Sequence, residues 1–158
     1  MIQRRKAVEL VAAIAIVILL SPILVVALGW ILIEGLGLRA WFWRAHYRRG
    51  RDVVVVYSES PKWKLYFESQ IIPRLEGRSV VLNWSERRDW PEKYPWETRY
   101  VRRFAGDRGF NPCALVFLPN GRIKRVSFFD AFRDLKHGNP NPLQEAEYEL
   151  FRLIPAAA

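Results

Sequence analysis

The chain has few of the residues that build disulfides and metal sites. Of its 158 residues, one is a cysteine, Cys113, and two are histidines, His46 and His137. A lone cysteine excludes an intramolecular disulfide, so nothing in the sequence calls for an oxidising compartment. The histidines lie far apart, and the sequence has no zinc-ligand spacing, no phosphate-binding glycine loop and no repeat. We therefore predict no metal and no cofactor.

Acidic residues are scarce at one end of the chain only. The net charge is +9, but residues 1–51 carry eight Lys or Arg against two Glu, whereas residues 52–158 carry seventeen against fourteen Asp or Glu. Most of the excess positive charge therefore flanks the apolar N-terminal segment. Basic residues beside an apolar run point to lipid headgroups before they point to nucleic acid. We expect anionic membrane lipids as a partner, and no nucleic acid.

Residues 10–33 form a run of twenty-four residues without a charge. A helix rises about 1.5 Å per residue and the hydrocarbon core of a bilayer is about 30 Å thick, so this run is long enough to cross it. A cleaved signal peptide has a shorter apolar core, of roughly 7–15 residues, that ends at a small-residue cleavage site. We predict a membrane helix within residues 1–38 and a membrane localisation.

A proline interrupts this helix at its centre. Pro22 of the Ser21-Pro22 pair has no N–H, and its ring clashes with the carbonyl of Ile18, so the helix should kink or break there. The segment is then either a kinked span or a re-entrant hairpin. Basic residues precede it at positions 4–6 and follow it from Arg39 onward, and the positive-inside rule places both flanks in the cytoplasm. This favours the hairpin, and either form predicts a cytoplasmic C-terminal domain.

The pattern RRKAVELVAAIAIVILLSPILVVALGWILIEG resembles the re-entrant membrane helix of monotopic phosphoglycosyl transferases over about residues 4–36. That family shares the basic start, the apolar run, the central Ser-Pro and the second apolar half. Its catalytic Asp-Glu pair and basic phosphate-binding motif do not follow in this chain. The resemblance therefore implies the topology and not the transferase activity.

Residues 39–51 are expected to form a basic and aromatic juxtamembrane segment. Aromatic rings favour the headgroup level of a bilayer, and arginines there attract anionic lipid. The segment is interpreted as an anchor, with a specific site for a phosphate-bearing lipid as the alternative. His46 is interpreted as an interfacial side chain. The residues expected to bind headgroups are Arg39, Trp41, Trp43, Arg44, Arg48, Arg49 and Arg51.

Residues 52–158 are predicted to form a soluble α/β domain. The β-branched run at residues 52–57 is typical of a strand that is buried on both faces. The alternation of strands and helices implies a parallel crossover, and the Pro119–Arg122 turn implies an antiparallel hairpin. The order is βαβαββα: strands at 52–57, 79–84, 113–118 and 123–129, helices at 62–75, 96–105 and 142–153, and a polar loop at 85–95.

This order resembles the thioredoxin fold, with the best local match at RGFNPCALVFLPNGRI, residues 108–123. The resemblance implies a cis-proline at Pro112 just before the third strand. Thioredoxins act through a C-x-x-C pair at the start of the first helix, where the helix lowers the thiol pKa. This chain has Ser58-Glu59-Ser60-Pro61 at that place, so two-thiol exchange is excluded. Cys113 is interpreted as a core residue rather than a nucleophile.

Three further groups of polar residues were considered, and two of them, around Glu59 and in the loop at 84–96, are candidates for a site. Glu59 with the hydroxyls of Ser58 and Ser60 either caps the helix or performs acid–base chemistry, and we favour the cap. Residues 130–137 resemble a solvated face and suggest no metal. The loop at 84–96 mixes charge with aromatic rings, which is typical of a protein-binding surface, although its rings could instead pad the core or rest on the membrane. Its candidate partner-binding residues are Trp84, Arg87, Arg88, Trp90, Tyr94 and Trp96.

The sequence thus supports two hypotheses. The first is a membrane-anchored, redox-inactive thioredoxin-like domain that acts as a binding or assembly module at the cytoplasmic membrane face. The second is a protein that handles a polyprenyl-phosphate-type lipid or assists a membrane glycan enzyme. Enzymatic activity is not expected under the first hypothesis.

Overall fold

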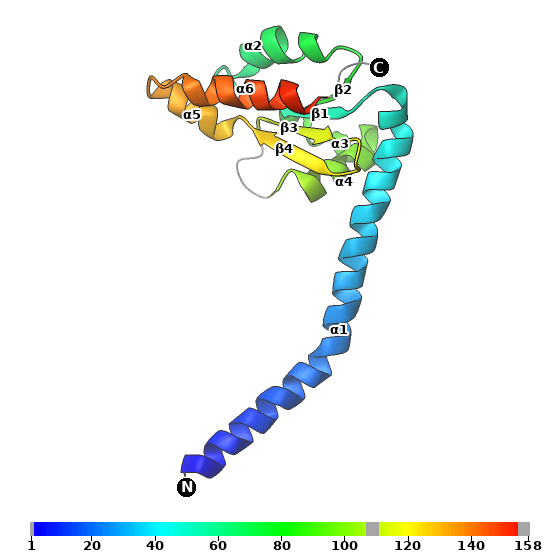
Figure 1. Cartoon of the computed structure of the whole chain (residues 1–158), viewed down its shortest axis with the longest axis vertical. Coiled ribbons are helices and arrows are strands. Elements are labelled where there is room, and N and C mark those ends of the chain that lie inside the picture. The colour runs from blue at the N-terminus through cyan, green and yellow to red at the C-terminus, as the bar shows by residue number, and fades with distance from the viewer. Residues whose placement is uncertain (1, 107–110, 155–158) are drawn as a thin grey trace. The chain divides into compact units, whose positions relative to one another are not determined.

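The chain begins with a long helix, α1 (Ile2–Ala45). The computed structural model describes residues 2–106 and 111–154, with side chains from Val17 onward. α1 continues through Pro22 and bends in its N-terminal half, drawn in blue in Figure 1. Pro22 cannot donate to the carbonyl of Ile18, and the Ser21 hydroxyl donates to that carbonyl instead, at 2.9 Å. The Ser-Pro pair therefore supplies a bend whose freed carbonyl is still hydrogen-bonded.

The apolar part of α1 has no protein covering it among the described residues. Every residue from Val17 to Leu28 is exposed. By length and composition, this is a helix that can cross a membrane. The chain divides into two compact units, Met1–Gly37 and Leu38–Ala158. The second unit is the α/β domain.

A mixed four-stranded sheet lies at the centre of this domain, in the order β2-β1-β3-β4. β1 pairs with β2 in parallel, with Val53 opposite Ser79, and pairs with β3 in the antiparallel sense. β3 and β4 form an antiparallel hairpin. The predicted parallel crossover and the predicted hairpin are both confirmed. The strands are β1 (Val53–Tyr57), β2 (Ser79–Asn83), β3 (Cys113–Phe117) and β4 (Ile123–Ser127).

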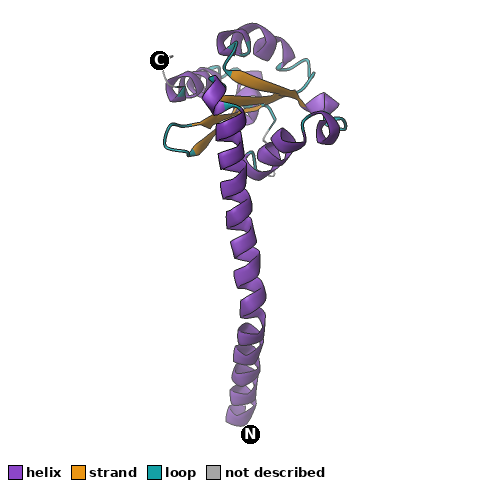
Figure 2. Cartoon of the chain, turned by 90° about the vertical axis from the view of Figure 1, so that its right-hand side faces the viewer, coloured by secondary structure: helices purple, strands orange, loops and turns teal. Residues whose placement is uncertain are grey.

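Helices cover both faces of the sheet, as Figure 2 shows. One face carries the segment between β1 and β2 together with the two C-terminal helices; the other carries the end of α1 and the helices between β2 and β3. The helices are η1 (Tyr47–Arg49), α2 (Lys64–Tyr66), η2 (Phe67–Ile71), η3 (Pro73–Leu75), η4 (Trp84–Glu86), α3 (Trp90–Lys93), α4 (Pro95–Phe104), α5 (Phe129–Lys136) and α6 (Asn141–Leu153).

β1 is buried on both faces, as its run of β-branched residues predicts. Successive side chains of a strand point to opposite faces. Val53, Val55 and Tyr57 accordingly belong to one core cluster, and Val54 and Val56 belong to the other. The central strand therefore joins two separate cores.

The predicted helix at residues 62–75 is broken into three short turns. α2 begins at Lys64, and a π-helical turn follows in which the Ile72 N–H donates to the Phe67 carbonyl. This wider turn buries both Phe67 and Ile71. Pro73 then starts η3, because it has no N–H to continue the hydrogen-bond ladder. The sequence spacing had indicated one regular helix.

Two other predicted bounds differ from the structure. The polar loop at 85–95 contains the short helices η4 and α3. β4 ends at Ser127, and Phe128 then turns its fully buried ring into the core before α5 begins. The Asn111–Pro112 peptide bond is cis. The predicted thioredoxin-like match covers residues 108–123, and its residues 108–110 lie outside the described residues.

The domain begins before the predicted boundary at Asp52. Leu38 and Phe42, on the last turns of α1, are buried in the second core cluster. The Phe42 ring stacks on Tyr100, with 4.4 Å between centroids, and on Phe117, at 5.4 Å. The juxtamembrane segment is therefore part of the folded domain.

Replacing Phe42 with alanine tests this packing. Loss of a fully buried ring leaves a cavity, so we expect Phe42→Ala to lower the free energy of unfolding by about 3–5 kcal/mol. Denaturant unfolding of the full chain in detergent micelles, followed by tryptophan fluorescence, measures the change. Phe129→Ala is the matched control, since that ring is 39% exposed and its loss should cost less. Equal losses in the two variants would contradict the packing.

Candidate headgroup and partner-binding sites

Four of the seven predicted headgroup-binding residues surround one pocket of about 560 Å³. The last turn of α1 and the short helix η1 supply its walls, and Gly50 ends η1 in the left-handed conformation, with a φ of 78°. The described lining contains three arginines and no acidic residue, so it favours an anion. The lining residues are Trp41, Arg44, Ala45, Arg48 and Arg49.

The other predicted headgroup residues lie outside this pocket. The Arg39 guanidinium lies over the Phe104 ring, 5.6 Å from its centroid. Trp43 is 47% exposed and lies 5.5 Å from the Arg48 guanidinium. Arg51 is exposed. Trp43 and Arg51 therefore remain accessible, whereas Arg39 contacts the domain.

The sequence suggested that His46 is an interfacial side chain, but the structure places it inside the domain. Its ring is buried, and its Nε2 lies 3.0 Å from a carboxylate oxygen of Glu97. Burial raises the pKa of Glu97, but the hydrogen bond from His46, a backbone hydrogen bond and the His46 charge outweigh it and lower the pKa overall. Trp41 packs edge-on to His46, at 5.2 Å, and stacks on Trp96, at 5.9 Å. This cluster holds the end of α1 against α4.

The predicted partner-binding loop contributes to a second pocket, of about 470 Å³. Its lining includes four of the six predicted partner-binding residues: Trp84, Arg87, Arg88 and Trp90. The other two, Tyr94 and Trp96, do not line it. One face of α4 forms the opposite wall, which sequence reasoning missed. The i, i+3, i+4, i+7 spacing of its residues was the signal that could have found it. These are Thr98, Val101, Arg102 and Ala105, followed by Gly106.

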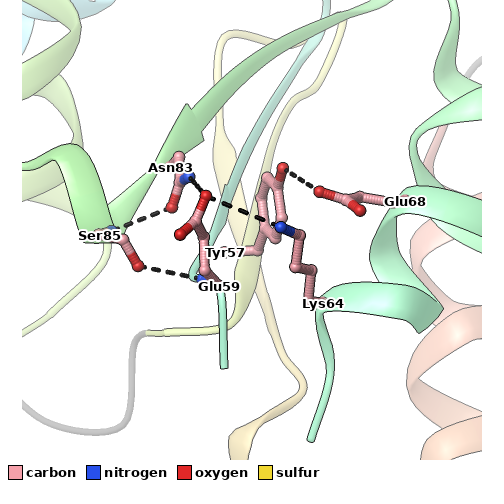
Figure 3. Close-up of polar contacts among 6 residues, drawn as sticks. All are labelled: Tyr57, Glu59, Lys64, Glu68, Asn83 and Ser85. Carbon is pink, nitrogen blue, oxygen red and sulfur yellow. Dashed lines mark hydrogen bonds and ion pairs between the residues drawn. The ribbon is translucent and has the colours of Figure 1, made fainter. Parts of the chain in front are cut away.

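A polar network occupies the carboxyl ends of β1 and β2 (Figure 3). The Glu59 carboxylate accepts a hydrogen bond from the Asn83 side chain, at 3.4 Å, and lies 3.8 Å from Lys64 Nζ. The Glu59 N–H donates to the Ser85 hydroxyl, at 3.1 Å. Glu59 thus links two strand ends instead of capping a helix, and the favoured cap interpretation is wrong for this residue.

The neighbouring side chains of this network are also engaged. The Tyr57 hydroxyl donates to Glu68 at 3.1 Å, and burial, with that hydrogen bond, raises its pKa to about 12. The Ser58 hydroxyl accepts from the Trp63 indole at 3.0 Å. The Ser60 hydroxyl accepts from the Lys62 N–H at 3.5 Å. Glu59 lines neither the arginine pocket at residues 41–49 nor the pocket between η4 and α4.

The charged residues at 130–137 lie on and after α5. Arg133 pairs with Asp130, at 3.0 Å, and with Asp134, at 3.7 Å, and all three side chains are well exposed. Arg133, Lys136 and His137 also line a third pocket, of about 490 Å³, with aromatic rings that include Trp63 and Phe132. Among residues 17–106 and 111–154, no group of three His, Cys, Asp or Glu side chains is placed to hold a metal.

Cys113 lies at the start of β3 and is fully buried. Burial raises the pKa of its thiol to about 12, although the charge of nearby Arg125 opposes this. A thiol in this state is a poor nucleophile. The structure therefore agrees with a core role for Cys113.

No family model, curated protein or solved structure matches this chain. The arginine pocket at residues 41–49 holds four of the predicted headgroup-binding residues, and the pocket between η4 and α4 holds four of the predicted partner-binding residues.

The inertness of Cys113 can be measured by thiol labelling. An exposed thiol, with a pKa of about 8.5, reacts with maleimide readily at about pH 8. We expect the folded chain to remain unlabelled there, and to label fully once denatured. Cys113→Ala/Ser69→Cys is the control, since Ser69 is exposed and should label in the folded chain. Rapid labelling of folded Cys113 would show that the thiol is accessible.

Proposed function

We propose that this chain is a membrane-anchored binding module, in which a redox-inactive, thioredoxin-like domain is held at the cytoplasmic membrane face. The single observation that carries the proposal is the arginine pocket formed by Trp41, Arg44, Arg48 and Arg49, which follows the apolar part of α1 in the chain. The pocket takes the phosphate of an anionic lipid headgroup. The domain then presents its remaining surface to a protein partner.

The exposure of α1 supports the membrane part of this proposal. A run of apolar side chains from Val17 to Leu28 would be costly to keep in water, and a bilayer would cover it. Arginines that follow such a run attract anionic lipid at the cytoplasmic leaflet. Guanidinium groups also bind phosphate with two parallel hydrogen bonds, which suits a pocket lined by three of them.

The topology of the sheet supports the thioredoxin-like part. The strands and the helical segments between them follow the predicted order βαβαββ, and two helices, α5 and α6, come after β4 where the sequence predicted one. β3 runs antiparallel to both of its neighbours in a sheet of order β2-β1-β3-β4. The place of the redox pair is taken by residues 58–63, which include no cysteine. Because Cys113 is buried and its thiol is protonated at neutral pH, the domain is suited to binding and not to thiol exchange.

The sidedness of the two ends tests the topology. We expect a cysteine introduced before Arg4 in a Cys113→Ala background to be labelled from the cytoplasmic side, together with one at Ser69, because both flanks of the uncharged run at residues 10–33 are basic. Membrane-impermeant maleimide applied to inside-out and right-side-out vesicles measures this. Labelling of the N-terminal cysteine from outside would show that the segment is a kinked span and not a re-entrant hairpin. Labelling of Ser69→Cys from outside would overturn the cytoplasmic placement.

The lipid that copurifies with the chain tests the headgroup pocket. We expect native mass spectrometry to find anionic phospholipid on the full chain, and Arg48→Gln/Arg49→Gln to lose most of it, because two of the pocket's three guanidiniums are removed. Arg122→Gln/Arg152→Gln removes the same charge from sites outside the pockets and is the control. Equal loss in both variants would mean that the pocket binds no lipid.

The same measurement separates a second function from the first. The arginine pocket also suits the phosphate of a polyprenyl phosphate, which would make the chain a lipid-handling protein or an accessory to a membrane glycan enzyme. A phosphorylated polyprenol in place of phospholipid, lost in Arg48→Gln/Arg49→Gln, would favour this second function.

A further inference from the structure

We propose that the second pocket, between η4 and α4, binds an acidic segment of a partner protein that inserts an apolar side chain between flanking carboxylates. This inference rests on the proposed function, because it gives the chemistry of the protein partner. This pocket has a volume of about 470 Å³, with Arg87, Arg88 and Trp90 from the η4 side and Val101, Arg102 and Ala105 from the α4 side.

The floor of this pocket offers an apolar surface. The buried Trp90 indole donates to the Asn83 carbonyl at 3.0 Å, and the Thr98 hydroxyl donates to the Tyr94 carbonyl at 2.7 Å. Both polar groups are thereby used within the domain. Three of the lining residues, Trp90, Val101 and Ala105, are apolar and buried, and we take them as the floor. An apolar side chain of the ligand would gain free energy by leaving water there.

Unpaired positive charge stands on two sides of the floor. Arg87 and Arg88 follow η4, while Arg102 lies on α4. Arg88 and Arg102 make no hydrogen bond or ion pair with any described residue, and both are exposed. Arg87 lies over the Trp84 ring, 5.2 Å from its centroid. No described lining residue is acidic. Carboxylates on both sides of an apolar group would therefore meet guanidinium partners.

The surrounding charges favour a peptide over a membrane surface. Glu86, Asp89 and Glu92 are exposed on the same loop as the arginines, and only Asp89 has a lysine partner, Lys93, at 3.1 Å, among the described ion pairs. A flat anionic bilayer would bring its phosphates close to these carboxylates, which costs free energy. A short segment seated in the pocket lies against lining residues of which none is acidic. Tryptophan and arginine are also the residues that contribute most to protein interfaces.

Fluorescence anisotropy of a labelled peptide tests the proposal. The full chain is placed in nanodiscs of neutral phosphatidylcholine, and the peptide carries one Phe between two pairs of Glu. We expect saturable binding, which falls by about tenfold or more in Arg88→Gln/Arg102→Gln, because two charged hydrogen-bond partners are lost. Arg122→Gln/Arg152→Gln removes equal charge elsewhere and should change the affinity by less than about twofold.

Further peptides and competitors decide between occupants. Replacing Phe with Ala, or every Glu with Gln, should each weaken binding, since the pocket needs both the apolar anchor and the carboxylates. Equal weakening in the two arginine variants would overturn the proposal. The proposal would also be overturned if pyrophosphate or anionic vesicles displaced the labelled peptide at a lower concentration than the unlabelled peptide does. Failure of peptide binding with the headgroup lipid still present on the chain would overturn this inference and leave the membrane-anchored module intact.

Discussion

The structure depends on a central strand that is buried on both faces. β1 consists of four valines and Tyr57, and every one of them is buried. Such a strand is stable only if each face of its sheet is covered by another layer. One cover comes from residues 63–75 with α5 and α6. The other needs more apolar surface than α3 and α4 provide, and Leu38 and Phe42 at the end of α1 supply it.

This requirement places the headgroup pocket on the folded domain. Because Phe42 packs between Tyr100 and Phe117, the turn of helix that carries it is fixed on the domain. Trp41, Arg44 and Arg48 lie within one or two turns of Phe42 and line the pocket beside it. His46 adds a second attachment through Glu97. The residues expected to meet lipid are therefore held by core packing rather than by a flexible linker.

Much of the fold could be predicted from short patterns. The run at Val53–Tyr57, the Asn120-Gly121 turn and the period of α6 each carry a local signal that tertiary packing does not override. The π turn at Phe67 and the burial of His46 could not be predicted, because each depends on a partner far away in the sequence. The π turn fits the side chains of Phe67 and Ile71 into one core. The buried His46 ring contacts Glu97, which is 51 residues away in the sequence. Thioredoxin-like identity and membrane crossing remain proposals.

The candidate sites were predictable only where a site lies within one stretch of sequence. Trp84, Arg87, Arg88 and Trp90 are close together in the sequence and line one pocket, whereas their wall from α4 became evident only in the fold. The same limit applies to Glu59, whose partners Asn83 and Ser85 come from the next strand.

The distribution of charge leaves two pockets of the domain rich in arginine. Several carboxylates are paired within the domain: Asp52 with Arg78, Glu97 with His46, and Glu147 with Arg74. Six arginines that have no ion pair with a described residue line the two pockets: Arg44, Arg48, Arg49, Arg87, Arg88 and Arg102. Guanidiniums that surround a hollow and lack an ion pair of this kind are available to an outside anion. The acid-free pocket at residues 41–49 suits an extended anionic surface, and the pocket at residues 84–106, bordered by acids, suits a single narrow ligand. In the function that we propose, the first pocket attaches the domain to lipid and the second recognises a partner.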